Sequence, residues 1–115
     1  MGDVLNEPSE NPRLAILRSF AEKRPQDPFP RYALAMEFKT AGDASGAWQV
    51  FEPLIAEHPD YVASYAPAAE VLLELDRREQ ARELYGKGIA AASRRGDAHA
   101  CDHLEAALAQ LEIDK

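Results

Sequence analysis

The chain has 115 residues, 46% of them hydrophobic and 29% charged, which is ordinary for one soluble globular domain. Its net charge of −7 argues against a nucleic-acid-binding protein, because phosphate contacts require a basic surface. The single cysteine, Cys101, excludes an internal disulfide, and no apolar run reaches the roughly 18 to 20 residues of a membrane span. We therefore expect a cytoplasmic protein with no nucleic-acid or membrane partner.

Residues 1–10 are acidic and polar, where a secretory signal would be basic and then apolar. We predict a disordered acidic tail there and a single domain over residues 11–115. Residues with β-branched side chains are sparse, and no stretch alternates with period two for long enough to form a strand. The domain is therefore predicted to be all-α, with about six helices.

In chain order, Asn11 is the predicted cap of the first helix, which Pro12 opens and Pro25 ends. A second helix follows the cap Asp27 and runs to Gly42, a residue suited to the left-handed end of a helix. The apolar stripe expected on the first helix consists of Leu14, Leu17, Phe20 and Ala21.

The third helix is predicted to begin after the cap Asp43, and it contains Pro53, where a lost backbone hydrogen bond predicts a kink. We expect Asp60 to cap the fourth helix. A later start with Ser64 as the cap is the alternative, because Pro67 suits a first helical turn.

A fifth helix is predicted over residues 78–95 and a sixth over residues 97–112. Gly86 and Gly88 lie inside the fifth helix, where each disfavours the helix by about 1 kcal/mol relative to alanine. We interpret them as marks of close contact with another helix, or of a slightly softened helix. Short loops make all sequential helices antiparallel neighbours.

Two stretches of the chain match when the sequence is shifted by 34 residues. Small residues recur between bulky ones at the same positions of both stretches. The matches pair Ala35 with Ala69, Ala47 with Ala81, Phe38 with Leu72, and Phe51 with Tyr85. A repeat of this length indicates stacked helical hairpins, because one hairpin cannot bury its apolar face alone.

These residues resemble the tetratricopeptide repeat family. The resemblance implies an α-solenoid of antiparallel hairpins forming a right-handed superhelix. A half repeat would span 11–24, full repeats 28–61 and 62–95, and a solvating helix 97–112. The chain departs from the family pattern at Arg31, which replaces the expected tryptophan.

In this family the first helix of each repeat lines an inner groove. The resemblance therefore implies groove-lining side chains on the second and fourth helices: Phe29, Tyr32, Met36, Lys39, Ala63, Ala66, Glu70, Leu73 and Glu74. The alternative is that Phe29, Tyr32 and Met36 are buried beneath the first helix. The lysine–asparagine clamp with which some repeats hold acidic chaperone tails is not expected, since Tyr32, Met36 and Pro67 occupy its places.

We therefore expect a non-enzymatic protein–protein interaction module that binds a peptide or helix of a partner protein in this groove. We expect no cofactor, metal or catalytic residue. The negative charge of the chain suits a basic or apolar partner better than an acidic one. The alternative is a homodimeric structural protein that buries its groove, or one end of the solenoid, against a second copy.

The sequence contains one cluster that resembles a chemical site. His99 and His103 are four residues apart and share a helix face, and together with Asp102 they resemble an inverted zinc-protease motif. That motif needs a further carboxylate ligand well downstream, and only 12 residues follow His103. We expect a solvated helix face here, with Cys101 as a small core residue.

Overall fold

A computed structural model describes residues 11–114 of the chain, and the predicted tail over residues 1–10 lies outside this range. Within it, every element is helical. The elements are α1 (Pro12–Lys23), α2 (Pro28–Thr40), α3 (Ala44–Glu57), the short 3-10 helix η2 (Val62–Ser64), α4 (Tyr65–Glu74), α5 (Arg78–Arg95) and α6 (Ala98–Ile113). The predicted all-α class and the six α-helices are confirmed for the part of the chain that is described.

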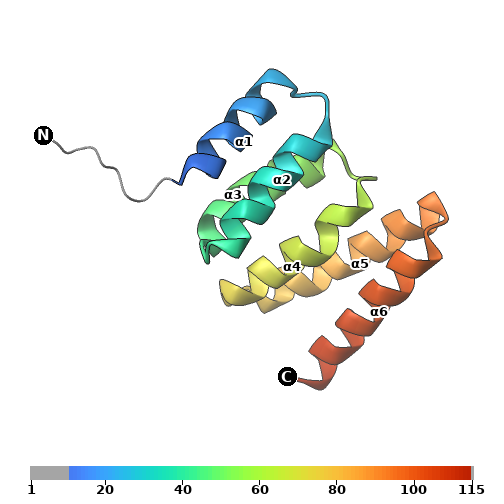
Figure 1. The fold of residues 1–115 in the computed structure, drawn as a ribbon. Helices are drawn as coiled ribbons and strands as arrows, with labels where there is room; N and C mark the ends of the chain where they lie inside the picture. Colours follow the sequence, from blue (N-terminus) through green and yellow to red (C-terminus); the bar gives the residue numbers. More distant parts are fainter. Residues whose placement is uncertain (1–10, 115) are drawn as a thin grey trace, which may run out of the picture.

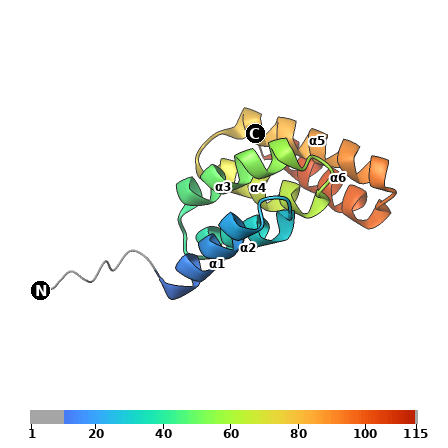
Figure 2. The same ribbon diagram turned by 90° about the horizontal axis from the view of Figure 1, so that it is seen from above.

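The helices form hairpins that stack in one direction. The most extensive contacts join α2 to α3 and α4 to α5 within hairpins, and α1 to α2, α3 to α4 and α5 to α6 between successive units. Figure 1 shows α2, α4 and α6 along one face of the molecule, with α3 behind α2 and α5 behind α4. The view from above shows the stack running from α1 at one end to α6 at the other (Figure 2).

Four helices begin at a side-chain cap, and three of these caps, Asn11, Asp27 and Asp43, were predicted. In each case a side-chain oxygen accepts a hydrogen bond from a backbone N–H of the first turn, which has no partner within the helix. The caps are Asn11, Asp27, Asp43 and Asp97, with donor–acceptor distances of 2.8 to 3.0 Å. Gly42 follows α2 with a φ of +83°, in the left-handed region as predicted. The α3 helix runs through Pro53.

The prediction that Asp60 caps the fourth helix is wrong. The chain after Asp60 forms the 3-10 turn η2, and α4 begins at Tyr65. Pro67 is thus the third residue of α4, where its missing N–H removes no helical hydrogen bond. Ser64 holds the N-cap position, as the alternative predicted, but its side chain makes no capping bond. Its buried hydroxyl has no hydrogen-bond partner among the described residues.

The main core lies between the two layers of helices. The four repeated alanines are fully buried, so the two helices of each hairpin approach closely, and Phe51 and Tyr85 fill the space between hairpins. A smaller core joins Leu14 and Ala21 of α1 to Leu34 of α2. Phe20 departs from the stripe predicted for α1, because its side chain is 49% exposed.

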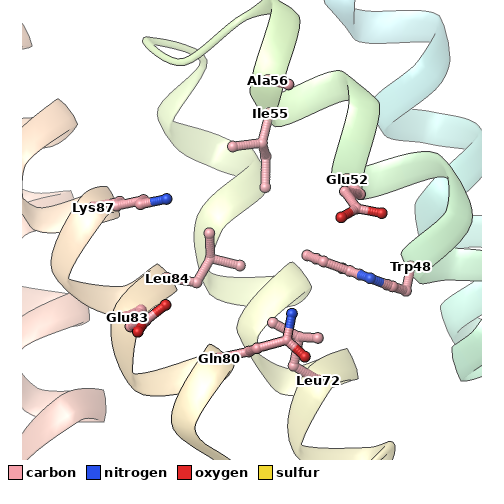
Figure 3. A pocket seen from close by; sticks show the side chains of 9 residues that line it. All are labelled: Trp48, Glu52, Ile55, Ala56, Leu72, Gln80, Glu83, Leu84 and Lys87. Carbon is pink, nitrogen blue, oxygen red and sulfur yellow. The ribbon is translucent and has the colours of Figure 1, made fainter. Parts of the chain in front are cut away.

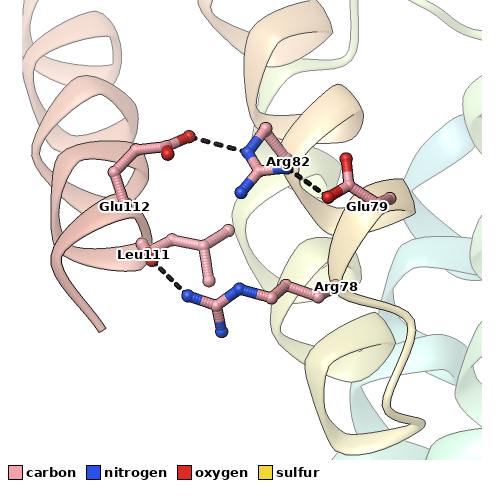
Figure 4. A network of polar contacts seen from close by, with 5 residues as sticks. All are labelled: Arg78, Glu79, Arg82, Leu111 and Glu112. Atoms are coloured by element: carbon pink, nitrogen blue, oxygen red, sulfur yellow. Dashed lines mark hydrogen bonds and ion pairs between the residues drawn. The ribbon is translucent and has the colours of Figure 1, made fainter. Parts of the chain in front are cut away.

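Hydrogen bonds and ion pairs join α6 to α5 (Figure 4). Arg82 of α5 donates to Glu112 of α6 over 2.7 Å and also pairs with Glu79 on its own helix. Arg78 donates to the backbone carbonyl of Leu111, in the last turn of α6, where carbonyls lack helical donors. The α6 helix has no basic residue of its own in that turn, so Arg78 also places a positive charge at the negative end of its dipole.

Candidate partner-binding face

The face formed by α2, α4 and α6 carries an aromatic cluster at one edge, consisting of Phe29, Tyr32 and Tyr61. The rings of Phe29 and Tyr32 are 6.3 Å apart between centroids, and those of Tyr32 and Tyr61 meet edge to face at 5.7 Å. Partial burial raises the pKa of the Tyr61 hydroxyl, with smaller contributions from Tyr32 and Asp27. The cluster joins the start of α2 to the loop before α4.

Phe29, Tyr32 and Met36, which were predicted to line the groove from α2, lie in different environments in the structure. Phe29 is 59% exposed. Tyr32 and Met36 are partly buried, and they pack against the main core rather than the smaller core beneath α1. The alternative that all three are buried beneath the first helix therefore does not hold. Tyr61 was missed by the sequence analysis, since the residue 34 positions earlier is Asp27 and the repeat gives no apolar signal there.

A hollow of about 370 Å³ lies between the start of α4 and α6, and it begins one residue after Tyr61 in the chain. We call it the α4–α6 hollow. Its apolar lining is Val62, Ala63, Ala66, Ala100 and Leu104, and its polar lining is Asp97, His99 and His103. Ala63 and Ala66 were predicted to face a groove. The two histidines were predicted to lie on a solvated face, and they are indeed exposed, but they also line this hollow.

The other half of the face holds the predicted residues near the ends of α2 and α4. The Lys39 ammonium lies 3.1 Å from a carboxylate oxygen of Glu70, so these two predicted residues form an ion pair across the helices. Such an exposed pair stabilises by only about 0 to 1 kcal/mol. Leu73 packs partly against the core, and Glu74 is exposed. Because Lys39 pairs with Glu70, the exposed Glu74 carries the remaining negative charge among these predicted residues.

The described residues offer little for metal or thiol chemistry. No group of three or more histidine, cysteine, aspartate or glutamate side chains in residues 11–114 could hold a metal ion. Cys101 is partly buried and packs against the main core, and its Sγ lies 3.8 Å from a carboxylate oxygen of Glu105. Burial and the neighbouring carboxylates of Glu105 and Asp102 raise the pKa of its thiol, which disfavours the reactive thiolate. None of the described helices combines the length and apolarity that crossing a membrane requires.

The architecture defines a class of protein: a stack of helical hairpins with a continuous face built from the first helix of each hairpin. Two solved structures of a tetratricopeptide repeat domain protein from Salinibacter ruber share it, each with 36% identity and a TM-score of 0.74. The match to the solution structure covers 79% of this chain and 92% of that one, and the match to the crystal structure covers 77% and 99%. The chain belongs to the tetratricopeptide repeat family, which makes it a protein-interaction module in the general sense.

A protein from Bordetella parapertussis has the same fold, with a TM-score of 0.76, 19% identity and 91% of each chain covered. No protein-family model matches the sequence, and no curated protein matches it either.

Proposed function

We propose that the chain binds a peptide or helix of a partner protein along the α2–α4–α6 face. The observation that carries this proposal is the continuity of the aromatic cluster with the α4–α6 hollow. Both lie at the N-terminal ends of their helices, and the chain passes directly from Tyr61 of the cluster to Val62 of the hollow. Together they give a largely apolar strip across three neighbouring helices of one layer, α2, α4 and α6.

The chemistry of the strip indicates how a partner is held. Phe29 gains the most burial when a partner covers it, because more than half of its side chain is exposed before binding. Aromatic side chains of this kind dominate binding energy at protein interfaces. The α4–α6 hollow is of a size that accepts one apolar anchor side chain from the partner. The acidic character of the chain favours basic residues flanking that anchor.

A peptide-display selection with a blocking variant tests the proposal. Ala63→Arg fills the α4–α6 hollow from an exposed position, and Ala90→Arg places the same side chain at an exposed position of α5 outside the strip. We expect peptides selected on the wild type to be lost with Ala63→Arg and retained with Ala90→Arg. Equal retention by both folded variants would refute binding at the strip.

Self-association is a second candidate, favoured by one observation on α1. Ile16 and Phe20 are one helical turn apart and are 55% and 49% exposed, so they form an apolar ridge at the end of the stack. Sedimentation analysis across concentration tests it: self-association predicts a dimer that Phe20→Glu dissociates. A wild-type monomer at all concentrations would remove this candidate.

A further inference from the structure

A second hollow, of about 250 Å³, lies between α3 and α5, the helices of the other layer. We call it the α3–α5 hollow (Figure 3). Its floor is Leu72 of α4, which is almost fully buried. The walls come from Trp48, Glu52, Ile55 and Ala56 of α3 and from Gln80, Glu83, Leu84 and Lys87 of α5. No residue of the α2–α4–α6 strip contributes to it.

The hollow combines an aromatic ring with aliphatic walls. Trp48 is the only tryptophan of the chain, and its indole extends from α3 into the hollow in Figure 3. Ile55 and Leu84 point into the same space from the two helices. A tryptophan face attracts cations through its ring quadrupole, and the planar guanidinium of arginine also stacks on it.

Among residues 11–114 the acidic residues at the rim are unpaired, unlike Glu37, Glu57, Glu70 and Glu112, which form ion pairs across helices. Elsewhere, arginine or lysine side chains neutralise glutamates across helices, as in the pairs of Arg13 with Glu37 and Arg31 with Glu57. Within residues 11–114, Glu52 and Glu83 make no hydrogen bond and no ion pair. The rim thus offers two free carboxylates, and the single ammonium of Lys87 leaves its net charge negative.

We propose that the α3–α5 hollow is a second docking site, which receives an arginine side chain of a partner protein. The guanidinium lies against the Trp48 indole and pairs with the Glu52 carboxylate, which is one helical turn away on α3. The aliphatic stem packs on Ile55 and Leu84. Arginine fits better than lysine because it stacks on the ring and presents several donors in one plane. The site acts independently of the strip on the opposite layer.

The single indole gives a direct readout, since the protein has one indole N–H signal in a two-dimensional nitrogen–proton NMR spectrum. The probe is an acetylated and amidated Ala-Arg-Ala tripeptide, and the control replaces its arginine with citrulline, which has the same shape without the charge. We expect a saturable shift of the indole signal with the arginine peptide, and binding about tenfold weaker with citrulline.

Two variants complete the test. The double change Glu52→Gln and Glu83→Gln removes both charges at exposed positions, and we expect about tenfold weaker binding of the arginine peptide. Glu74→Gln, at an exposed position at the end of α4, should leave binding unchanged. No saturable indole shift, equal binding of the citrulline peptide, or unchanged binding by the double variant would each overturn the proposal.

Discussion

The rings of Tyr32 and Tyr61 meet edge to face across the junction between the first full hairpin and the second, with 5.7 Å between their centroids. Pairs in this geometry stabilise a fold by about 0.5 to 1.5 kcal/mol beyond the burial of their area. Tyr32 also packs beside Phe29, and Tyr61 directly precedes Val62 of the α4–α6 hollow in the chain. Tyr32 therefore contributes both to the packing of the stack and to the proposed partner-binding surface, whereas Phe29 contributes chiefly to that surface.

Substitutions at these two positions should separate stability from binding. Phe29→Ser is expected to lower the free energy of unfolding by less than about 0.5 kcal/mol, because the side chain is mostly exposed. Tyr32→Ala is expected to lower it by about 1 to 3 kcal/mol, since it removes a ring packed against the core. Urea unfolding measures both values. A loss for Phe29→Ser as large as that for Tyr32→Ala would contradict this division.

Two glycines of α5 predict opposite effects of the same substitution. A Cβ atom at Gly88 would lie 2.7 Å from the Cβ atom of Tyr65, which is fixed to the backbone of α4. Gly88→Ala should therefore destabilise by about 1 to 3 kcal/mol through overpacking. A Cβ atom at Gly86 meets nothing within 4 Å, so Gly86→Ala should stabilise by about 0.5 to 1 kcal/mol through helix propensity. Thermal unfolding of the two variants checks the signs.

Alkaline pH should destabilise the fold through buried tyrosines. Burial raises the pKa of Tyr65, opposed by Arg94 and assisted by Asp60, and burial also raises the pKa of Tyr85. An unfolded tyrosine ionises near about pH 10, so above that pH the native state holds more protons than the unfolded state. The free energy of unfolding should then fall as pH rises above about 10, and this contribution is constant below it.

The matched variant for this pH dependence is Tyr65→Phe, which also removes the hydrogen bond from the Tyr65 hydroxyl to the Pro59 carbonyl. We expect it to be less stable at neutral pH and to lose less further stability in alkali. Urea unfolding at a series of alkaline pH values measures the slope. A slope steeper than that of the wild type would oppose the assignment.

The contact of Arg78 with the end of α6 should govern local opening of that helix. Arg78→Ala removes the donor to the Leu111 carbonyl, and we expect roughly threefold to tenfold faster amide exchange in the last turn of α6. The first turn, capped by Asp97, should not change. Arg77→Ala is the control, because Arg77 is exposed and its side chain caps nothing. Equal acceleration in both variants would show that Arg78 does not hold the helix end.

The helix boundaries were predictable wherever a cap acts within its own turn. The side chains of Asn11 and Asp43 accept hydrogen bonds from backbone N–H groups three residues ahead. Contacts this short in sequence can be predicted from the residue types alone. Asp60 looked the same but is used differently, because Arg94 of α5 binds its carboxylate at 2.7 Å. The local sequence at Asp60 resembles a cap, but the chain after it forms the 3-10 turn η2 instead.

The candidate face was predictable in part, because the repeat places α2 and α4 in equivalent roles. Ala63 and Ala66 could be assigned on that basis. Tyr61 and His103 could not, since each joins the face through packing between helices rather than through a repeated residue type. The sequence could not predict that the carboxylates of the α3–α5 hollow are unpaired, because only the structure shows which glutamates form ion pairs with arginine or lysine.

The central claim is that a partner lies along the α2–α4–α6 face, and backbone amide NMR tests it most directly. The protein is titrated with the peptide most enriched in selection on the wild type. We predict the largest chemical-shift changes at Tyr32, Ala63, Ala66 and His103, along the strip from the aromatic cluster to the α4–α6 hollow. Largest changes at Ala56 and Lys87, on the other layer, with the strip unaffected, would contradict the account.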